Sequence, residues 1–206
     1  MKNYRLITWL LSGVLLASTV FQLPAVASAD PAADSSSAVA PIMYEDILTQ
    51  PSLQADLKQY LSAYRELVEP DMLDAYDDYV IYLTTTLKHR KYEALANTAY
   101  QKYRVDSVKT RVQSYNGMTH SVIPNYKKFV SLMKTVNPAD SKLNKLHQNL
   151  LKGISLQLEG FQLLQKYFSK AKRDDLLFYK ANNKLKSGKK WIDQYNTELF
   201  NYVAQF

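Results

Sequence analysis

The 206-residue sequence contains no cysteine, five glycines and seven prolines. A chain without cysteine can form neither disulfides nor zinc–thiolate sites, and no cysteine can carry a lipid. Scarce glycine argues against a turn-rich β fold, and no polar–apolar alternation persists for more than a few residues. Because 47% of the residues are apolar and 22% are charged, the chain can bury a core. We expect its stability to come from burial.

The first 29 residues have the features of a secretory signal peptide. Lys2 and Arg5 precede an apolar run over residues 6–20, and Ala27-Ser28-Ala29 supplies the small side chains that a signal peptidase requires. The apolar run, about 15 residues, is shorter than the roughly 20 that span a bilayer. This length favours a cleaved signal peptide over an uncleaved membrane anchor.

The sequence after the signal peptide divides into two parts. Residues 30–41 are rich in alanine, serine and aspartate with no periodicity, which predicts a flexible lead. Residues 42–206 form the remaining single domain, which we expect to be a helical bundle. The expected location is secreted, extracellular or loosely associated with the cell wall.

Apolar residues recur at spacings of three and four from residue 53 onward, which predicts amphipathic helices. The first helix covers residues 53–67, with Ser52 as its N-cap and an end before Pro70. Pro70 suits the first turn of a second helix. That helix either continues or breaks near residues 88–91, and the three threonines at 84–86 favour the break.

A further apolar stripe runs from Val105 to Val136 in one phase and predicts one long, interrupted helix. The turn dipeptide Asn116-Gly117 and the proline at 124 predict a loop or a kink between them. Asn137-Pro138 ends this element.

The last two helices have the clearest pattern. Heptad stripes cover residues 143–168 and 178–206, and the short charged segment 169–175 separates them. Asp140 or Ser141 can cap the first of the two helices. The pattern predicts an antiparallel hairpin. The whole sequence therefore predicts an all-α, antiparallel bundle of four or five amphipathic helices with left-handed, coiled-coil-like packing.

Gly153 and Gly160 lie seven residues apart and share one flank of their helix. A flank without side chains lets a neighbouring helix approach closely, and we expect the rings of Trp191, Tyr195 and Tyr202 to face it. The alternative is that both glycines lie on an exposed face.

Three histidines are candidates for chemistry, and they do not cluster. His147 falls on an apolar stripe, where we expect a core histidine that donates to a backbone carbonyl. The alternative for His147 is the centre of an enzyme or a metal carrier. His89 lies in the basic run of residues 88–91, four positions before Glu93, and we interpret the run as a solvated turn. His120 is expected in an exposed loop.

Four aspartates, at positions 71, 74, 77 and 78, occupy the start of the second predicted helix. They complement the positive end of the helix dipole, and weak Ca²⁺ binding is the alternative. The chain has no zinc-protease, di-metal, phosphate-loop, dinucleotide or nucleophile-elbow motif. We therefore expect a non-enzymatic protein with no catalytic residue, no metal and no cofactor.

Charge is unevenly distributed along the chain. Residues 41–80 hold nine acidic and two basic residues, whereas residues 81–206 hold 22 basic and eight acidic ones. A basic body of this kind can bind a polyanion while the acidic part faces away from it. The densest group, named here the hairpin patch, consists of Lys166, Lys170, Lys172, Arg173, Lys180, Lys184, Lys186, Lys189 and Lys190.

The segment from Val122 to Phe206 resembles a recurrent helical module of exported proteins from Gram-positive bacteria. The resemblance rests on Val122-Ile123-Pro124-Asn125-Tyr126, Asn137-Pro138, Leu143, Leu146-His147, Glu159-Gly160 and Gln194-Tyr195-Asn196-Thr197-Glu198-Leu199. It implies a helical fold and an exported location, and it implies no activity.

These features favour a secreted, non-enzymatic interaction protein, or one associated with the cell envelope. Its expected partners are anionic wall polymers or lipid headgroups, bound through the hairpin patch. Specific nucleic-acid binding is not expected, because most tyrosines fall on apolar stripes rather than on a stacking platform. The alternative function is a membrane-active protein whose amphipathic helices open onto lipid.

Overall fold

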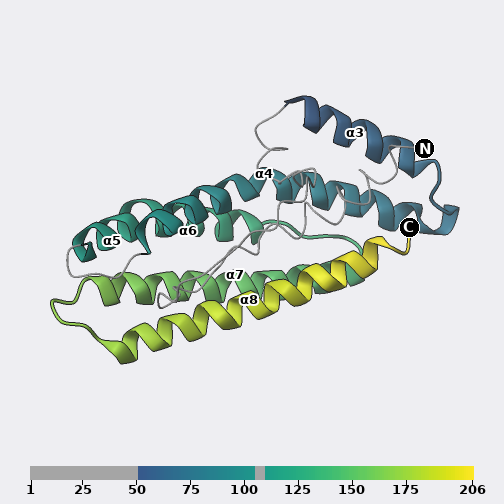
Figure 1. The fold of residues 1–206 in the computed structure, drawn as a ribbon. Coiled ribbons are helices and arrows are strands. Elements are labelled where there is room, and N and C mark those ends of the chain that lie inside the picture. The colour runs from purple at the N-terminus through teal and green to yellow at the C-terminus, as the bar shows by residue number, and fades with distance from the viewer. Residues whose placement is uncertain (1–50, 105–109) are drawn as a thin grey trace, which may run out of the picture.

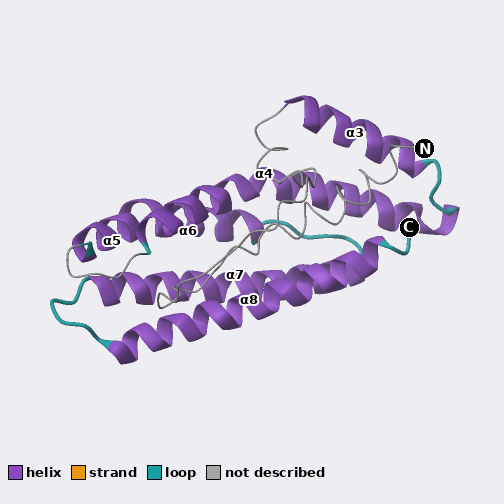
Figure 2. Ribbon diagram, viewed as in Figure 1, coloured by secondary structure: helices purple, strands orange, loops and turns teal. Residues whose placement is uncertain are grey.

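A computed structural model describes residues 51–104 and 110–206 of this chain. Its regular structure in those ranges is entirely helical, without a strand (Figure 2). The all-α prediction is therefore confirmed. The predicted signal peptide at 1–29, the predicted lead at 30–41 and the predicted helix start at Val105 lie outside the described residues.

The helices form an elongated bundle in which neighbours run antiparallel (Figure 1). α4 packs on α6, α6 on α7 and α7 on α8, while α3 lies along the first half of α4. Short connections between successive helices make this up-and-down arrangement the natural one. The elements are α3 (Pro51–Arg65), η2 (Pro70–Met72), α4 (Leu73–Tyr103), α5 (Arg111–Gly117), η3 (Met118–Val122), α6 (Ile123–Met133), α7 (Ser141–Phe168) and α8 (Asp175–Val203).

α4 is a single helix of 31 residues, so the predicted break near residues 88–91 was wrong. The threonines that favoured the break are accommodated by their own helix. The hydroxyl of Thr84 donates to the carbonyl of Val80 at 2.8 Å, and that of Thr86 donates to Leu83 at 3.1 Å. Both hydroxyls are hydrogen-bonded while the helix stays intact. The threonine side chains therefore do not compete with the backbone hydrogen bonds of the helix.

α5, η3 and α6 follow one another without a loop, so a π-helical turn at Met118–Val122 stands where a loop or a kink between Asn116 and Pro124 was predicted. The wider turn accommodates Pro124, which has no N–H to donate. The side-chain amide of Asn125 donates to the carbonyl of Ser121 at 2.8 Å. A Cβ added at Gly117 would lie 2.1 Å from the ring of Tyr103, so this glycine serves close packing rather than a turn.

The helix N-termini follow the capping chemistry of aspartate. Asp140 accepts from the backbone N–H of Leu143 at 2.7 Å, which confirms it as the N-cap of α7. Asp174 accepts from Leu177 N–H at 2.9 Å and caps α8 in the same way. The predicted N-cap Ser52 was wrong, because α3 begins at Pro51 and Ser52 lies inside it.

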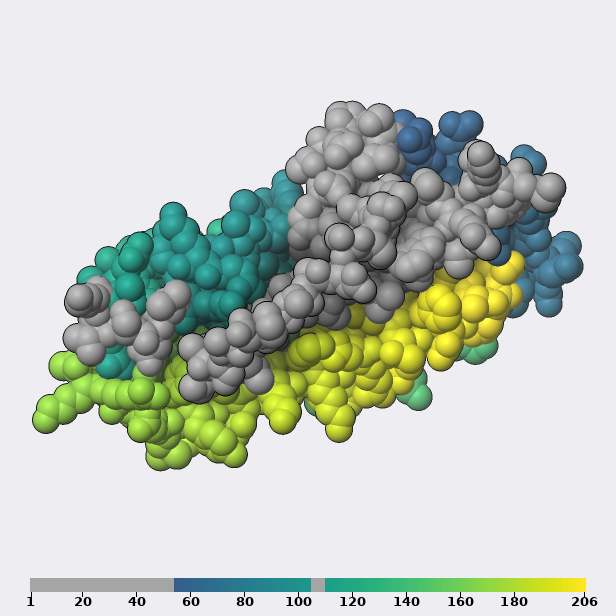
Figure 3. Space-filling model, viewed as in Figure 1, coloured from purple at the N-terminus to yellow at the C-terminus, as the bar shows by residue number. Residues whose placement is uncertain are grey.

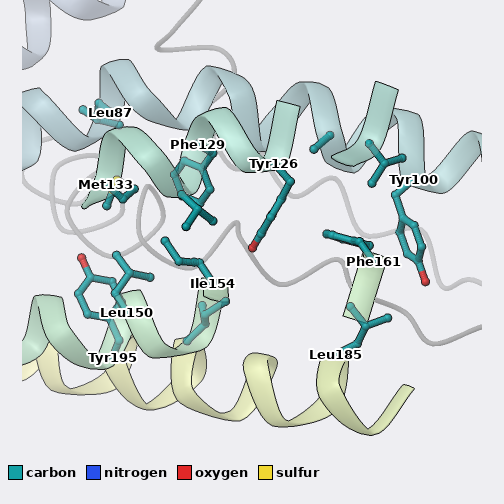
Figure 4. Packing of buried hydrophobic residues seen from close by; sticks show 14 of the residues in the cluster. Leu87, Tyr100, Tyr126, Phe129, Met133, Leu150, Ile154, Phe161, Leu185 and Tyr195 are labelled. Atoms are coloured by element: carbon teal, nitrogen blue, oxygen red, sulfur yellow. The ribbon is translucent and has the colours of Figure 1, made fainter. Parts of the chain in front are cut away.

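Aromatic residues fill the centre of the bundle. Tyr126 and Phe129 of α6 point toward Ile154 and Phe161 of α7 (Figure 4). The ring of Phe161 lies 5.0 Å from that of Tyr126 and 5.1 Å from that of Tyr100. The α7 stripe is confirmed throughout, since every one of its predicted members is buried: Leu143, His147, Leu150, Ile154, Gln157, Phe161, Leu164 and Phe168.

Glycines bring the backbones of α7 and α8 into contact. A Cβ added at Gly153 would lie 2.7 Å from Cγ1 of Ile192 and 3.0 Å from the carbonyl oxygen of Gly188. One added at Gly160 would lie 2.7 Å from the side chain of Leu185. These distances are too short for real Cβ contacts, so the predicted close approach is confirmed and the exposed alternative is wrong.

The aromatic neighbours predicted for these glycines were wrong. Trp191 lies at the edge of the interface, where the ammonium of Lys152 stands 3.7 Å from its ring centroid. The hydroxyl of Tyr195 bonds to that of Tyr82 on α4, and Tyr202 reaches a backbone carbonyl of the same helix. The tyrosines therefore bridge α8 to α4, and small residues mediate its contact with α7.

Gly188→Ala should destabilise the fold because its added Cβ would lie 2.7 Å from the backbone oxygen of Gly153. We expect a loss of about 1–3 kcal/mol in the free energy of unfolding, as for other overpacked cores. Urea unfolding followed by far-ultraviolet circular dichroism measures it. Ser187→Ala, at the exposed neighbouring position, is the matched control and should change stability by less than about 0.5 kcal/mol. Equal stabilities of the two variants would contradict backbone contact at Gly188.

Candidate functional site

The hairpin patch occupies one end of the elongated bundle. Lys166 closes α7, the next three members lie in the link at residues 169–174, and the remaining five lie on the first half of α8. In the space-filling view this link projects in light green at the end of the molecule (Figure 3). Seven members are exposed, and Lys184 and Lys189 are partly buried. The fold therefore brings together the residues that the sequence predicted as a group.

Three of the nine basic groups pair with acidic side chains. These pairs are Arg173–Asp175 at 2.6 Å, Lys184–Glu159 at 2.7 Å and Lys189–Asp193 at 2.6 Å. All three pairs are solvent-exposed, and such pairs contribute little to stability. No acid within the described ranges forms an ion pair with the other six: Lys166, Lys170, Lys172, Lys180, Lys186 and Lys190. Acids of the described ranges thus leave most of the patch charge uncompensated.

Helix geometry distributes the patch around α8. Lys186 and Lys190 lie on the outward side, opposite the buried stripe, and Lys180 lies one turn before Lys184 on the same flank of the helix. Lys184 lies on the flank that faces α7, where its acidic partner is located, and Lys189 lies on the other flank. The patch is therefore a curved basic surface rather than a pocket, and it suits an extended polyanion better than a small anion.

Two of the four aspartates predicted at the start of the second helix, Asp77 and Asp78, have structural partners. Asp77 accepts two hydrogen bonds from the guanidinium of Arg65, at 2.6 and 2.7 Å, which holds α3 against α4. The hydrogen bonds from Arg65 also keep the pKa of Asp77 below its ordinary value. Asp78 accepts from the backbone N–H groups of Ala139 and Asp140 and holds the α6–α7 link. Among the described residues, no group of three or more His, Cys, Asp or Glu could hold a metal ion, so the calcium alternative gains no support.

Acidic and basic ends lie at opposite ends of the molecule. α4 begins beside the chain's C-terminus, where Phe206 packs on Tyr76 with ring centroids 5.4 Å apart. The α7–α8 link lies at the far end of the bundle (Figure 1). The acidic start of α4 and the α7–α8 link of the hairpin patch therefore lie at opposite ends of the long axis.

His147 is a fully buried core histidine, as predicted. Its Nε2 lies 3.0 Å from the carbonyl oxygen of Met133, and its Nδ1 lies 3.2 Å from the hydroxyl of Tyr82. A carbonyl can only accept, so Nε2 carries the hydrogen and Nδ1 accepts from Tyr82. The Tyr82 hydroxyl in turn accepts from Tyr195 at 2.8 Å. This chain of hydrogen bonds joins α4, α6, α7 and α8.

A buried ion pair lies beside this chain, and the sequence analysis missed it. Arg90 and Glu93 of α4 are 2.8 Å apart, with side chains only 4% and 2% exposed. Burial raises the pKa of Tyr195, and the nearby charge of Arg90 opposes that shift. The interpretation of residues 88–91 as a solvated turn was therefore wrong for Arg90. Arg90 lies seven residues after Leu83, on the same face of the helix. This spacing was the signal in the sequence that Arg90 faces the core.

A groove of about 540 Å³ lies between α3 and α4. Leu57, Leu61 and Val80 form part of its apolar lining, and Lys58 and Lys88 stand beside them. The groove offers burial to an apolar group. Its lining includes none of the three histidines and no member of the hairpin patch, but it does include Asp77 of the acidic group together with Arg65.

These features define the class of the protein: an elongated, all-α antiparallel bundle with a basic end and an acidic end. The chain matches no protein-family model, no curated protein and no solved structure. The resemblance of residues 122–206 to an exported Gram-positive module therefore stays a prediction. In the described ranges, no helix is sufficiently long and apolar to cross a membrane.

Stability should fall in mild acid because of His147. Burial lowers its pKa from the ordinary 6.5, so below about pH 6.5 the unfolded chain binds a proton that the folded chain resists. The contribution of neutral His147 is complete above that pH and is lost as the pH falls. Urea unfolding compared at about pH 7.5 and about pH 5 measures the loss of stability.

His147→Gln retains a donor for Met133 but cannot titrate, so its stability should depend less on pH than that of the wild type. His120→Gln, at an exposed position, is the control and should retain the wild-type dependence. The pKa of His89 is also lowered, by burial and by Lys88 and Lys91, so some dependence remains in both variants. An unchanged pH dependence in His147→Gln would show that His147 is not the group responsible.

Proposed function

We propose that this protein is a secreted, non-enzymatic protein of the cell envelope, held on a polyanionic surface by its hairpin patch. The observation that carries the proposal is the uncompensated charge of the patch at one end of the bundle. Six of its nine basic groups have no acidic partner among the described residues. The candidate surfaces are anionic wall polymers and lipid headgroups.

The patch binds by many weak contacts. Lysine is a point charge on a flexible stem, so several lysines can follow an extended chain of phosphates without a fixed geometry. Each contact releases counterions from the polyanion, and binding therefore weakens steeply as salt rises. Such binding is reversible, which suits a protein retained near the cell without a covalent tether.

The acidic end orients the bound molecule. Asp71 in η2 and Asp74 at the start of α4 are exposed, far from the patch along the bundle axis. A negative surface attracts one end of the bundle and repels the other. The protein is therefore expected to stand on the surface by its hairpin, with α3 and the groove beside it directed outward.

Removing patch lysines should weaken binding to a linear poly(glycerol phosphate), measured by isothermal titration calorimetry over a range of salt. The test variant replaces five exposed lysines by alanine: Lys170, Lys172, Lys180, Lys186 and Lys190. We expect at least about tenfold weaker binding and a shallower dependence of log affinity on log salt, because fewer counterions are released.

The matched control removes the same charge from another part of the surface. Its five exposed lysines are Lys127, Lys128, Lys134, Lys142 and Lys145. Their replacement by alanine should weaken binding by less than about threefold, since only long-range attraction is lost. If both variants lost affinity equally, binding would depend on net charge alone, which would contradict a specific role for the hairpin patch. If the wild type at low salt bound neither this polymer nor anionic lipid vesicles, the proposed function itself would be wrong.

A further inference from the structure

Two apolar side chains project from the first turn of α8, within the hairpin patch. Leu176 and Tyr179 are each 63% exposed. Because they lie three residues apart on a helix, they share one face. The heptad pattern of α8 places that face outward, opposite the stripe that begins at Ala181. Exposed leucine and tyrosine together at the end of a bundle form an apolar tip.

Basic residues surround this apolar tip. Lys172 and Arg173 precede it in the link, and Lys180 directly follows Tyr179. All three are exposed. Two carboxylates also lie here, but Asp174 caps α8 and Asp175 pairs with Arg173. The tip therefore combines apolar area with a surplus of positive charge.

The tip is held firmly from beneath. The ring of Phe178 packs on that of Tyr167 at 5.0 Å. The guanidinium of Arg111 lies over the same Tyr167 ring, 4.5 Å from its centroid. It also donates a hydrogen bond to the backbone carbonyl of Tyr167 at 3.1 Å. Leu176 and Tyr179 are thus exposed on a packed helix with a satisfied N-cap, and they need no rearrangement to bind.

We propose that the surface bound by the hairpin patch is an anionic lipid bilayer, with Leu176 and Tyr179 inserted at its interface. This inference rests on the proposed function and names the partner of the same site. A hydrophilic polymer gains nothing from exposed apolar side chains, whereas a bilayer buries them at the boundary between headgroups and acyl chains. Tyrosine is favoured at that depth, and lysine and arginine beside it reach the anionic headgroups.

The arrangement also fixes how the protein stands on the bilayer. The apolar residues lie at the end of the hairpin, and Lys186 and Lys190 lie further along the outward side of α8. Insertion is therefore limited to the first turn of α8, and the lysines behind it set the depth. The acidic start of α4 remains at the far end, away from the lipid (Figure 1).

Co-sedimentation with vesicles tests the inference. The vesicles consist of phosphatidylcholine alone or with roughly one third phosphatidylglycerol, which gives a strongly anionic surface. The test variant is Leu176→Ser with Tyr179→Ser, which keeps every charge of the patch. We expect the wild type to bind the anionic vesicles, and the variant to bind them at least about tenfold more weakly because apolar burial is lost.

The control is Leu67→Ser with Phe200→Ser, which removes a leucine and an aromatic ring that are 69% and 49% exposed outside the patch. It should bind like the wild type. All proteins carry the same N-terminal sequence, so any contribution of residues 1–50 cancels. As a second readout, a tryptophan placed by Tyr179→Trp should shift its emission to the blue on anionic vesicles, and one placed by Phe200→Trp should not.

The outcomes separate this inference from the proposed function. If the Leu176 and Tyr179 variant binds anionic vesicles as tightly as the wild type, insertion is excluded while electrostatic retention stands. If the wild type binds poly(glycerol phosphate) but not anionic vesicles, the partner is the polymer and the bilayer inference is wrong. If it binds neither at low salt, the proposed function fails as well.

Discussion

The backbone contact between α7 and α8 is the constraint on which the rest of the structure depends. Gly153 and Gly160 on one helix, and Gly188 on the other, leave no room for a Cβ, so the helices can meet only in one register. Close backbone contact leaves little empty space between the two helices, and dense packing matters in a chain without disulfides. The same register determines where the α7–α8 link emerges, and with it the basic end of the molecule.

The opposite side of the bundle is built differently. α8 and α4 are joined by long aromatic side chains, with the rings of Tyr79 and Tyr202 6.4 Å apart and the hydroxyls of Tyr82 and Tyr195 in contact. Tyrosine fills the wider space with its ring and places a polar atom where it can be satisfied. The hydrogen bonds that run from Tyr195 through Tyr82 and His147 to the carbonyl of Met133 require a specific alignment of the helices, so they contribute to a unique packing as well as to stability.

The sequence was sufficient to predict the elements whose pattern is regular. The stripes of α7 and α8, the hairpin between them, and the burial of His147 follow from apolar periodicity alone. It failed where local preference and tertiary packing disagree. The threonines of α4 suggested a break because propensity does not include their hydrogen bonds to preceding carbonyls.

Two other features required information that one sequence does not contain. Asn116-Gly117 is a strong turn signal, but Gly117 is needed because the ring of Tyr103 occupies the space of a side chain. The place of Arg90 on the apolar stripe of α4 could be read from the sequence, but the ion pair with Glu93 that allows both charges to be buried was seen only in the fold. The hairpin patch could be predicted because its members are close in sequence, whereas the exposure of Leu176 and Tyr179 beside it emerged only from the fold.

The central claim, that α7 and α8 lie in backbone contact, is tested most directly by nuclear Overhauser effects in the folded protein. The account predicts strong cross-peaks from the Hα protons of Gly153 to the side chain of Ile192, and from those of Gly160 to the methyl groups of Leu185. Cross-peaks from these glycines to the ring of Trp191 instead, or only to water, would show that the two helices meet through other residues and would contradict the account.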